Sequence, residues 1–253
     1  MDFVDTHCHV HADDYTLDGL EVMQSATAAG VGRFICVGTD EKDSKLAVKF
    51  AQDKPNVWAS IGLHPHDAKL GQEAFAVITA LVEQPKVVAI GECGLDYFYN
   101  HSAKEDQITA LRFQIELALA HNLPMIFHVR DAFDDFWPIF DSYKGIRGVI
   151  HSFTATTVQL EAILARNLYV GLNGIMTFTK DDAQLAAARV VPLEKLLLET
   201  DAPFLTPAPL RGKVNEPKNI VLTAEFLSRL RGESIEALGA QTTQNARKLF
   251  ELV

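Results

Sequence analysis

Residues 3–9 read Phe-Val-Asp-Thr-His-Cys-His, a short apolar and β-branched run that ends in two histidines. Comparable apolar runs recur along the whole chain, and their length and composition are typical of buried β-strands. We count eight of them, at residues 3–5, 33–37, 57–61, 87–90, 125–127, 148–150, 168–171 and 196–198. The sequence therefore predicts eight short strands.

Helix-like segments separate these strands. The clearest is 104–121, in which apolar residues recur at spacings of three and four, and two further helices are expected over 217–230 and 234–251. Apolar strands that alternate with helices predict an α/β protein with a parallel sheet covered by helices. Eight such units favour a single (β/α)8 TIM-type barrel with an additional C-terminal helix. An open doubly wound sheet is the alternative on the strand pattern alone.

The composition is that of an ordinary globular protein. The 253 residues include 23 Lys and Arg against 33 Asp and Glu, a net charge of -10, and 48% are hydrophobic, which excludes collagen-like, disordered and membrane-spanning classes. No linker or low-complexity tract divides the chain, so residues 1–253 are expected to form one domain. The acidic balance argues against a broad basic surface for duplex nucleic acid, but it leaves room for a phosphate substrate held by metal ions.

The sequence also predicts the cellular location of the protein. The first residues lack the basic and apolar regions of a signal peptide, and no run approaches the roughly 20 apolar residues of a membrane span. The three cysteines, Cys8, Cys36 and Cys93, are far apart, which argues against a disulfide framework or a zinc knuckle. We expect a cytoplasmic protein with no membrane contact and no obligate protein partner.

Ionisable side chains stand at the carboxyl ends of the predicted strands. His7 and His9 are two positions apart, so they point to the same side of their strand and can reach one ion. Strand ends converge at the mouth of a barrel, where active sites of this architecture lie. The full set is His7, His9, Glu92, His128, His151 and Asp201, with Glu92 expected just after the fourth strand.

Each of these residues alone would be read as a hydrogen-bonded histidine or a solvated acid. Together, four imidazoles and two carboxylates without partners in one barrel mouth would be costly. Their mixed nitrogen and oxygen atoms suit Zn, Mn or Mg, and six ligands exceed what one tetrahedral site uses. The sequence therefore predicts two divalent metal ions.

Several other residues are candidates to bind substrate. His64 and His66 either belong to a loop made rigid by Pro65 or contact a substrate phosphate or a metal-bound water. Arg130, Arg211 and Lys213 could bind phosphates, although loop cations are commonly solvated.

Residues outside this set are given other roles. Five aromatic residues near strand ends could stack on unpaired bases or simply pack: Tyr97, Phe98, Tyr99, Phe153 and Phe178. Glu199 is expected to support a ligand rather than to ligate, and His101 is expected at the surface on the helix side.

The order of motifs along the chain resembles a known family. The motifs include Asp-Thr-His-Cys-His at 5–9, Gly-Leu-His-Pro-His at 62–66, Ala-Ile-Gly-Glu-Cys-Gly-Leu-Asp-Tyr at 89–97, His-Val-Arg-Asp-Ala at 128–132, His-Ser-Phe at 151–153 and Glu-Thr-Asp-Ala-Pro at 199–203. This ordered set resembles the TatD-type metal-dependent deoxyribonucleases of the amidohydrolase superfamily.

The resemblance implies an assignment of ligands and an activity. It implies that His7, His9, Glu92 and Asp201 hold one ion, and that Glu92, His128 and His151 hold the other. The implied reaction is hydrolysis of DNA or of another phosphodiester, which we expect at single-stranded ends, with Glu92 and Asp201 as catalytic carboxylates. Asp201 is the candidate base that orients the attacking water.

Two other functions remain open at the level of sequence. The same ligands could hydrolyse an amide, an ester or a lactone, but a neutral carbonyl substrate would not require Arg130, Arg211 and Lys213. A non-catalytic metal-binding interaction protein would be expected to lack a ligand, and none is missing.

Overall fold

The computed structural model describes residues 2–252, which form two compact units. The terminal unit comprises residues 2–35 and 152–252, and the central unit comprises residues 36–151. The expectation that residues 1–253 form one domain stays a prediction.

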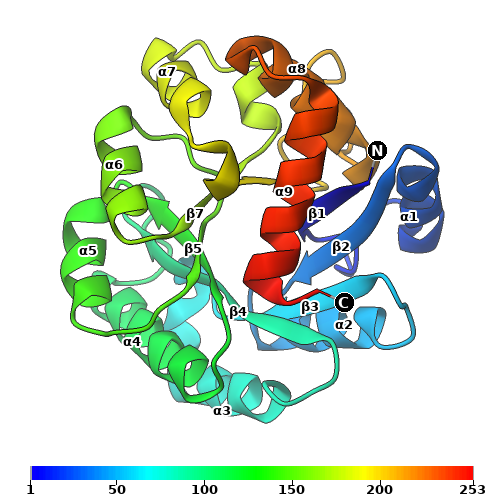
Figure 1. Ribbon diagram of the computed structural model, residues 1–253. Coiled ribbons are helices and arrows are strands. Elements are labelled where there is room, and N and C mark those ends of the chain that lie inside the picture. The colour runs from blue at the N-terminus through cyan, green and yellow to red at the C-terminus, as the bar shows by residue number, and fades with distance from the viewer. Residues whose placement is uncertain (1, 253) are drawn as a thin grey trace. The chain divides into compact units, whose positions relative to one another are not determined.

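The terminal unit brings together the two ends of the chain. Helix α9 lies against β1 and β8, and α8 packs beside it (Figure 1). The elements of this unit are β1 (Phe3–Cys8), α1 (Gly19–Ala28), most of β2 (Val31–Val37), α6 (Thr157–Ala165), β7 (Tyr169–Leu172), the 3-10 turn η2 (Gly174–Thr177), α7 (Asp182–Val190), η3 (Leu193–Lys195), β8 (Leu196–Leu198), η4 (Pro217–Asn219), α8 (Ile220–Arg231) and α9 (Ile235–Phe250).

The central unit contains four parallel strands, which pair in the order β3-β4-β5-β6. Helix α4 packs on β4, and α2 packs on β3. The elements are α2 (Glu41–Ala51), β3 (Val57–Ile61), η1 (Pro65–Leu70), α3 (Gly71–Leu81), β4 (Val87–Asp96), α4 (Lys104–Ala120), β5 (Met125–Arg130), α5 (Phe133–Asp141) and β6 (Gly148–Ile150).

All eight predicted strands are present. Within the central unit the strands pair in chain order, and in the terminal unit β7 pairs with β8 in parallel. Every residue of β1, β3, β6, β7 and β8 is buried, as expected for strands covered by helices. No helix within residues 2–252 combines the length and hydropathy needed to cross a membrane.

Short polar side chains determine where several helices begin. The carboxylate of Asp18 accepts hydrogen bonds from the backbone amides of Leu20 and Glu21, and Asp40 and Asp181 do the same for α2 and α7. These bonds satisfy amides that have no partner within a helix. The predicted helix over 217–230 starts three residues late, because η4 precedes α8.

Candidate metal sites

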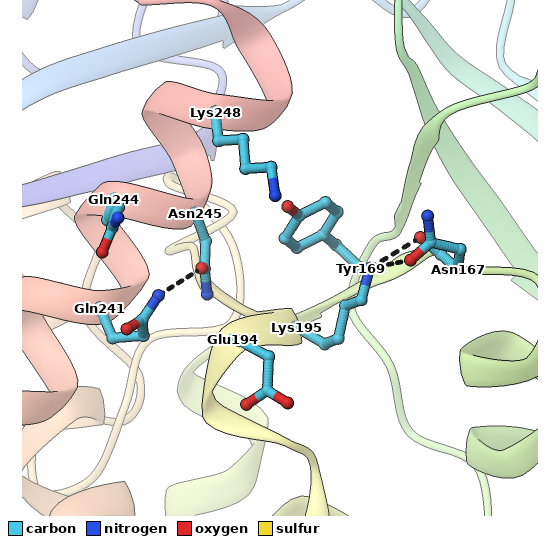
Figure 2. Close-up of a pocket in the computed structure, with 8 residues that line it drawn as sticks. All are labelled: Asn167, Tyr169, Glu194, Lys195, Gln241, Gln244, Asn245 and Lys248. Carbon is cyan, nitrogen blue, oxygen red and sulfur yellow. Dashed lines mark hydrogen bonds between the residues drawn. The ribbon is translucent and has the colours of Figure 1, made fainter.

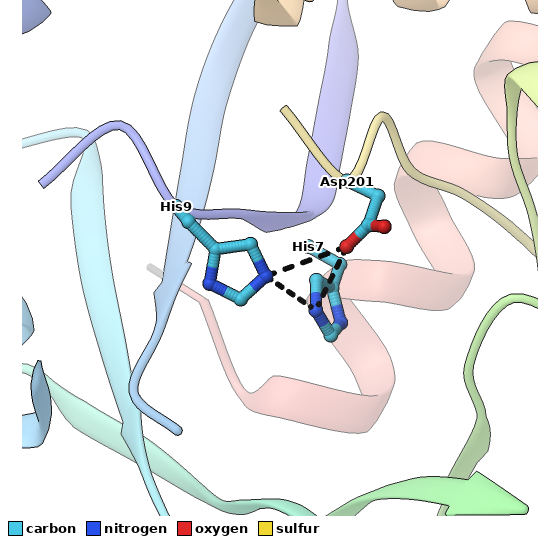
Figure 3. Close-up of side chains that lie close together, drawn as sticks. All are labelled: His7, His9 and Asp201. Atoms are coloured by element: carbon cyan, nitrogen blue, oxygen red, sulfur yellow. Dashed lines mark hydrogen bonds and ion pairs between the residues drawn. The ribbon is translucent and has the colours of Figure 1, made fainter. Parts of the chain in front are cut away.

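The terminal unit holds one cluster of possible metal ligands, here called the terminal cluster: His7, His9 and Asp201 (Figure 3). His7 lies in β1 and His9 just after it, so their rings point to the same side, and their Nε2 atoms are 3.2 Å apart. Asp201 Oδ1 lies 3.5 Å from His7 Nε2 and 3.3 Å from His9 Nε2. The sequence prediction that His7 and His9 can reach one ion agrees with this geometry.

Backbone pairing positions Asp201 beside the two histidines. The Asp201 amide donates to His7 O at 2.8 Å, and the His9 amide donates to Ala202 O at 2.7 Å. Asp201 adopts a left-handed conformation, with φ of 61°, which aspartate tolerates better than most side chains. The residues after β8 therefore continue the pairing with β1 and bring the Asp201 carboxylate to the terminal cluster.

A buried carboxyl group beneath the terminal cluster joins the same two segments. Asp5 Oδ1 accepts hydrogen bonds from the His7 amide at 3.2 Å and the Thr200 amide at 3.0 Å, and Asp5 Oδ2 accepts from Thr200 Oγ1 at 2.5 Å. Burial raises the pKa of Asp5 to about 8, although these hydrogen bonds oppose the shift. Asp5 is therefore neutral at pH 7 in the metal-free protein.

Glu199 and Asn215 support the loop after β8. Glu199 is buried, and its Oε1 accepts a 2.5 Å hydrogen bond from the Ser152 amide; that it supports a metal ligand stays a prediction. Asn215 is also buried and donates to the carbonyls of Thr200 and Phe204. Asn215 was not among the predicted site residues, because its contacts lie along a loop that has no periodic pattern.

The central unit holds a second group, here called the central cluster: His64, Glu92 and His128. Glu92 Oε1 lies 3.0 Å from His128 Nδ1 and 3.5 Å from His64 Nε2. His151 follows β6 and brings its Nε2 to 3.6 Å from the same oxygen. One carboxylate oxygen of Glu92 thus faces three imidazoles.

The expectation that Glu92 follows the fourth strand was wrong. Strand β4 runs on to Asp96, and Glu92 lies in its middle, next to an irregular register between Ile90 and Cys93. Gly91 and Gly94 have φ of 139° and 151°, and a Cβ at Gly94 would lie 1.8 Å from His128 O. Glycine at both positions allows β4 to pass close to β5, which brings Glu92 to His128.

Asp96 is a site residue that the sequence prediction missed. It is fully buried, and its Oδ2 lies 2.8 Å from His128 Nε2 and 3.2 Å from His66 Nε2. Glu92 and Asp96 are four positions apart on one strand and so share a face. That alternation would have identified Asp96 if the strand had been predicted to extend beyond Ile90.

Two imidazoles of the central cluster have shifted pKa values in opposite directions. Burial and the nearby His128 lower the pKa of His64 to about 4, so His64 is neutral at pH 7. Burial also disfavours charge on His128, but its hydrogen bonds with Asp96 and Glu92 outweigh burial and raise its pKa. The central cluster therefore combines a neutral imidazole with one that is easily protonated.

The predicted phosphate-binding cations lie at strand ends and loops. The Arg130 guanidinium, at the exposed end of β5, lies 4.4 Å from the centroid of Phe98. In the other unit, Arg211 lies 3.8 Å from the centroid of Phe178 and donates to Thr206 O. Lys213 is exposed in the same loop as Arg211.

Remaining histidines and cysteines have simpler surroundings. His101 is exposed, but it lies in the loop before α4 with its ring 4.6 Å from that of His66, so the prediction that placed it on the helix side was wrong. His11 is buried near His9, with ring centroids 6.2 Å apart. Cys8, Cys36 and Cys93 are buried thiols.

A pocket lies at the amino ends of β7 and β8 (Figure 2), whereas Asp201 follows the carboxyl end of β8. Its amide side chains serve the fold, because Asn245 donates to the carbonyls of Leu193 and Leu196 at 2.8 Å each. Lys195 donates to Asn167 O. No histidine lines the pocket, and the bonds of Asn245 and Lys195 to backbone carbonyls hold together the elements around it.

The donor atoms of both clusters fit a divalent cation. In each cluster, the ligand atoms lie within 4.8 Å of one another, so they can face one ion. Imidazole nitrogens with carboxylate oxygens are suited to zinc and to other first-row ions. Carboxylates and imidazoles brought this close from separate segments of the chain are the arrangement expected of a metal site.

Comparisons with known proteins agree with this chemistry. The family model described as TatD related DNase matches residues 4–251. The chain belongs to the TatD-related DNase family. The uncharacterized metal-dependent hydrolase YabD of Bacillus subtilis is 38% identical, over 98% of this chain and 98% of its own. The 3'-5' ssDNA/RNA exonuclease TatD of Salmonella typhimurium is 37% identical, over 98% of this chain and 99% of its own.

Solved structures of the TatD family share the fold. The crystal structure of YJJV, a TatD homologue from Escherichia coli K12, matches with a TM-score of 0.93 and 28% identity, covering 99% of this chain and 98% of its own. A TatD family hydrolase from Entamoeba histolytica matches with a TM-score of 0.89 and 25% identity, covering 100% and 99%. The predicted fold class, a (β/α)8 barrel with an additional C-terminal helix, is confirmed.

Asp5→Asn should remove a pH dependence of stability from the metal-free protein. The raised pKa of Asp5 means that its stabilising contribution is complete below the unfolded value of 3.8 and is lost as the pH rises to about 8. The free energy of unfolding of the variant, minus that of the original protein, should therefore rise by about 1.4 kcal/mol per pH unit over this range and then level off. Denaturant titrations across the range measure this difference.

The matched control is Asp53→Asn, at an exposed position of the central unit. Its titrations give the effect of exchanging an exposed aspartate for asparagine under the same conditions. A difference for Asp5→Asn that does not change with pH would contradict the raised pKa of Asp5.

Proposed function

We propose that this chain is a metal-dependent phosphodiesterase that cleaves single-stranded nucleic acid from its ends. The observation that carries the proposal is the convergence of buried imidazoles and carboxylates in the terminal and central clusters. Relatives that are 37% and 34% identical, from Salmonella typhimurium and Escherichia coli, are named 3'-5' ssDNA/RNA exonuclease TatD. A cytoplasmic location remains a prediction from the sequence.

We propose that two divalent ions, Mg, Mn or Zn, take part in one reaction. The terminal cluster supplies His7, His9 and Asp201, and the resemblance to the family adds Glu92 to them. Glu92, His128 and His151 hold the second ion in this proposal. That the two sets of ligands serve one reaction is supported by the family relationship, which extends over residues 4–251.

The surroundings of His64 support a role in binding substrate rather than metal. Its Nδ1 accepts a 3.2 Å hydrogen bond from the His66 amide, and its lowered pKa keeps it neutral. A neutral imidazole that accepts at Nδ1 carries its proton on Nε2, the atom that faces Glu92. His64 therefore has a hydrogen-bond donor at Nε2, which faces Glu92 in the metal-free protein and would suit a phosphate oxygen once Glu92 holds an ion, whereas a metal ligand needs a lone pair.

The chain's own residues can perform the remaining steps of hydrolysis. Bound divalent ions would supply positive charge to stabilise the phosphoryl oxygens and would lower the pKa of a water molecule. Asp201 orients the attacking water and accepts its proton. His64 and His66 donate hydrogen bonds to the phosphate. The cations proposed to bind substrate phosphates are Arg130, Arg211 and Lys213.

The cationic side chains favour a phosphodiester over a neutral carbonyl substrate. Within residues 2–252, the Arg130 guanidinium makes no hydrogen bond or ion pair, so its donors are available to a phosphate. An amide, an ester or a lactone would leave this charge without a role. A non-catalytic binding protein is disfavoured because none of the six predicted ligands, His7, His9, Glu92, His128, His151 and Asp201, is replaced in the sequence.

The binuclear proposal predicts two divalent ions per chain. The ligands form two partly open sets that share Glu92, and one closed site would not use all of them. Elemental analysis of active protein after mild dialysis should give a value near two. Saturation at one ion in a fully active sample would reject the binuclear site.

Asp201→Asn should reduce turnover by at least about a hundredfold at saturating metal. The exchange is nearly isosteric, but the amide has no negative charge and cannot accept the water's proton. Cleavage of an end-labelled single strand measures the rate, while circular dichroism and elemental analysis check the fold and the metal content. Asp53→Asn is the control for a lost surface charge. Near-normal turnover by a fully metallated Asp201 variant would remove this residue from the mechanism.

A linear single strand should be a better substrate than a covalently closed duplex circle. The net charge of -10 does not favour an extended basic track, which a duplex interior needs, whereas a few cations and aromatics can bind an unpaired end. Digestion of the two DNAs at equal phosphate concentration compares them. Equal rates would contradict the preference for ends.

A further inference from the structure

Two neighbouring aromatic side chains are exposed in the loop after β4. Phe98 is 54% exposed and Tyr99 is 52% exposed, and their ring centroids are 4.8 Å apart. Large apolar side chains are normally withdrawn from water, so two adjacent exposed rings suggest a binding surface. These two rings are called the aromatic platform below.

The loop that carries the aromatic platform is held by many hydrogen bonds. Asp96 Oδ1 accepts from the amides of Phe98 and Tyr99, at 3.0 and 2.9 Å. At the other end, Gln107 donates to the carbonyls of Asp96 and Ser102. The rings are therefore placed before any ligand arrives, which lowers the entropy lost on binding.

The carboxylate that holds this loop also contacts the central cluster. Asp96 Oδ2 lies 2.8 Å from His128 Nε2, while Asp96 Oδ1 holds the loop. The ring of Tyr99 is 5.4 Å from that of His66, which itself contacts Asp96. A strand whose phosphate lies at the central cluster would therefore pass close to the aromatic platform.

Arg130 places a positive charge on the platform. Its guanidinium carbon lies 4.4 Å from the centroid of Phe98 and 5.5 Å from that of Tyr99. Because the guanidinium makes no hydrogen bond or ion pair with any residue from 2 to 252, its N–H groups can bind a phosphate while its face stays on the ring. The aromatic rings that can stack on bases and the N–H groups that can bind a phosphate are therefore adjacent.

We propose that Phe98 and Tyr99 stack on unpaired bases of the substrate strand, while Arg130 binds a neighbouring phosphate. This inference rests on the proposed function and makes the loop after β4 the part of the site that selects single strands. A duplex hides the faces of its bases, so only a single strand or a frayed end can use the platform. Stacking depends little on base identity, so the selection is for unpaired rather than for particular bases.

The test compares two single-stranded oligodeoxynucleotides, one intact and one whose terminal nucleotides are abasic. Removing the terminal bases should lower kcat/KM of the original protein roughly ten- to a hundredfold. Phe98→Ala with Tyr99→Ala should lower kcat/KM by a similar factor on the intact strand and leave the abasic strand unaffected, because nothing remains to stack. The loss should appear mainly in KM.

Two sets of control variants separate stacking from general damage. Tyr99→Phe and Phe98→Trp keep an aromatic face and should retain activity, whereas Phe98→Leu keeps an apolar side chain without that face and should not. Leu20→Ala alters an exposed apolar residue of α1 and should change neither strand's kinetics. Elemental analysis of each variant checks that the metal content is unchanged.

The outcomes distinguish the platform from the proposed function. The stacking proposal is rejected, and the proposed nuclease function is kept, if the original protein cleaves both strands equally well. The same holds if the double variant loses activity equally on both strands. If the metallated original protein cleaves neither strand, the proposed function fails and the platform with it. A loss confined to the intact strand supports both.

Discussion

The structure of the site depends on the pairing between the first strand and the segment that follows the last one. The Asp5 carboxyl joins β1 to Thr200, residues that are 195 positions apart, and two backbone hydrogen bonds continue this pairing through His7 and Asp201. A contact across this sequence separation has a loop-closure entropy cost, which other contacts of the folded unit must offset. The terminal cluster is therefore a property of the folded unit and cannot form in a local segment.

Burial of Asp5 as a neutral acid is consistent with its position beneath the ligands. A second negative charge there would add to that of Asp201, and desolvation already disfavours it. Hydrogen bonds to the Thr200 amide and hydroxyl can be made by the protonated carboxyl group as well. The neutral carboxyl group of Asp5 therefore supports His7 and Asp201 structurally, and Asp201 carries the negative charge.

Asp96 has the corresponding position in the central unit. One of its oxygens faces His128 and His66, and the other accepts the amides of the loop that exposes Phe98 and Tyr99. Hydrogen bonds with His128 and His66 keep the pKa of Asp96 well below its usual range, although burial acts in the opposite direction. The orientation of an imidazole ligand and the position of the exposed rings therefore depend on one buried carboxylate.

The sequence by itself determined the number and order of the strands. A buried strand needs a run of apolar residues, and such a run can be recognised without knowing which strand pairs with it. The sequence also determined that His7 and His9 share a side, since alternation along a strand is local. Only the tertiary structure decided that β4 extends to Asp96, because an irregular register opposite β5, made possible by Gly91 and Gly94, interrupts the local pattern. The tertiary structure also decided which residues His64 and Asp96 contact, because their partners are distant in sequence.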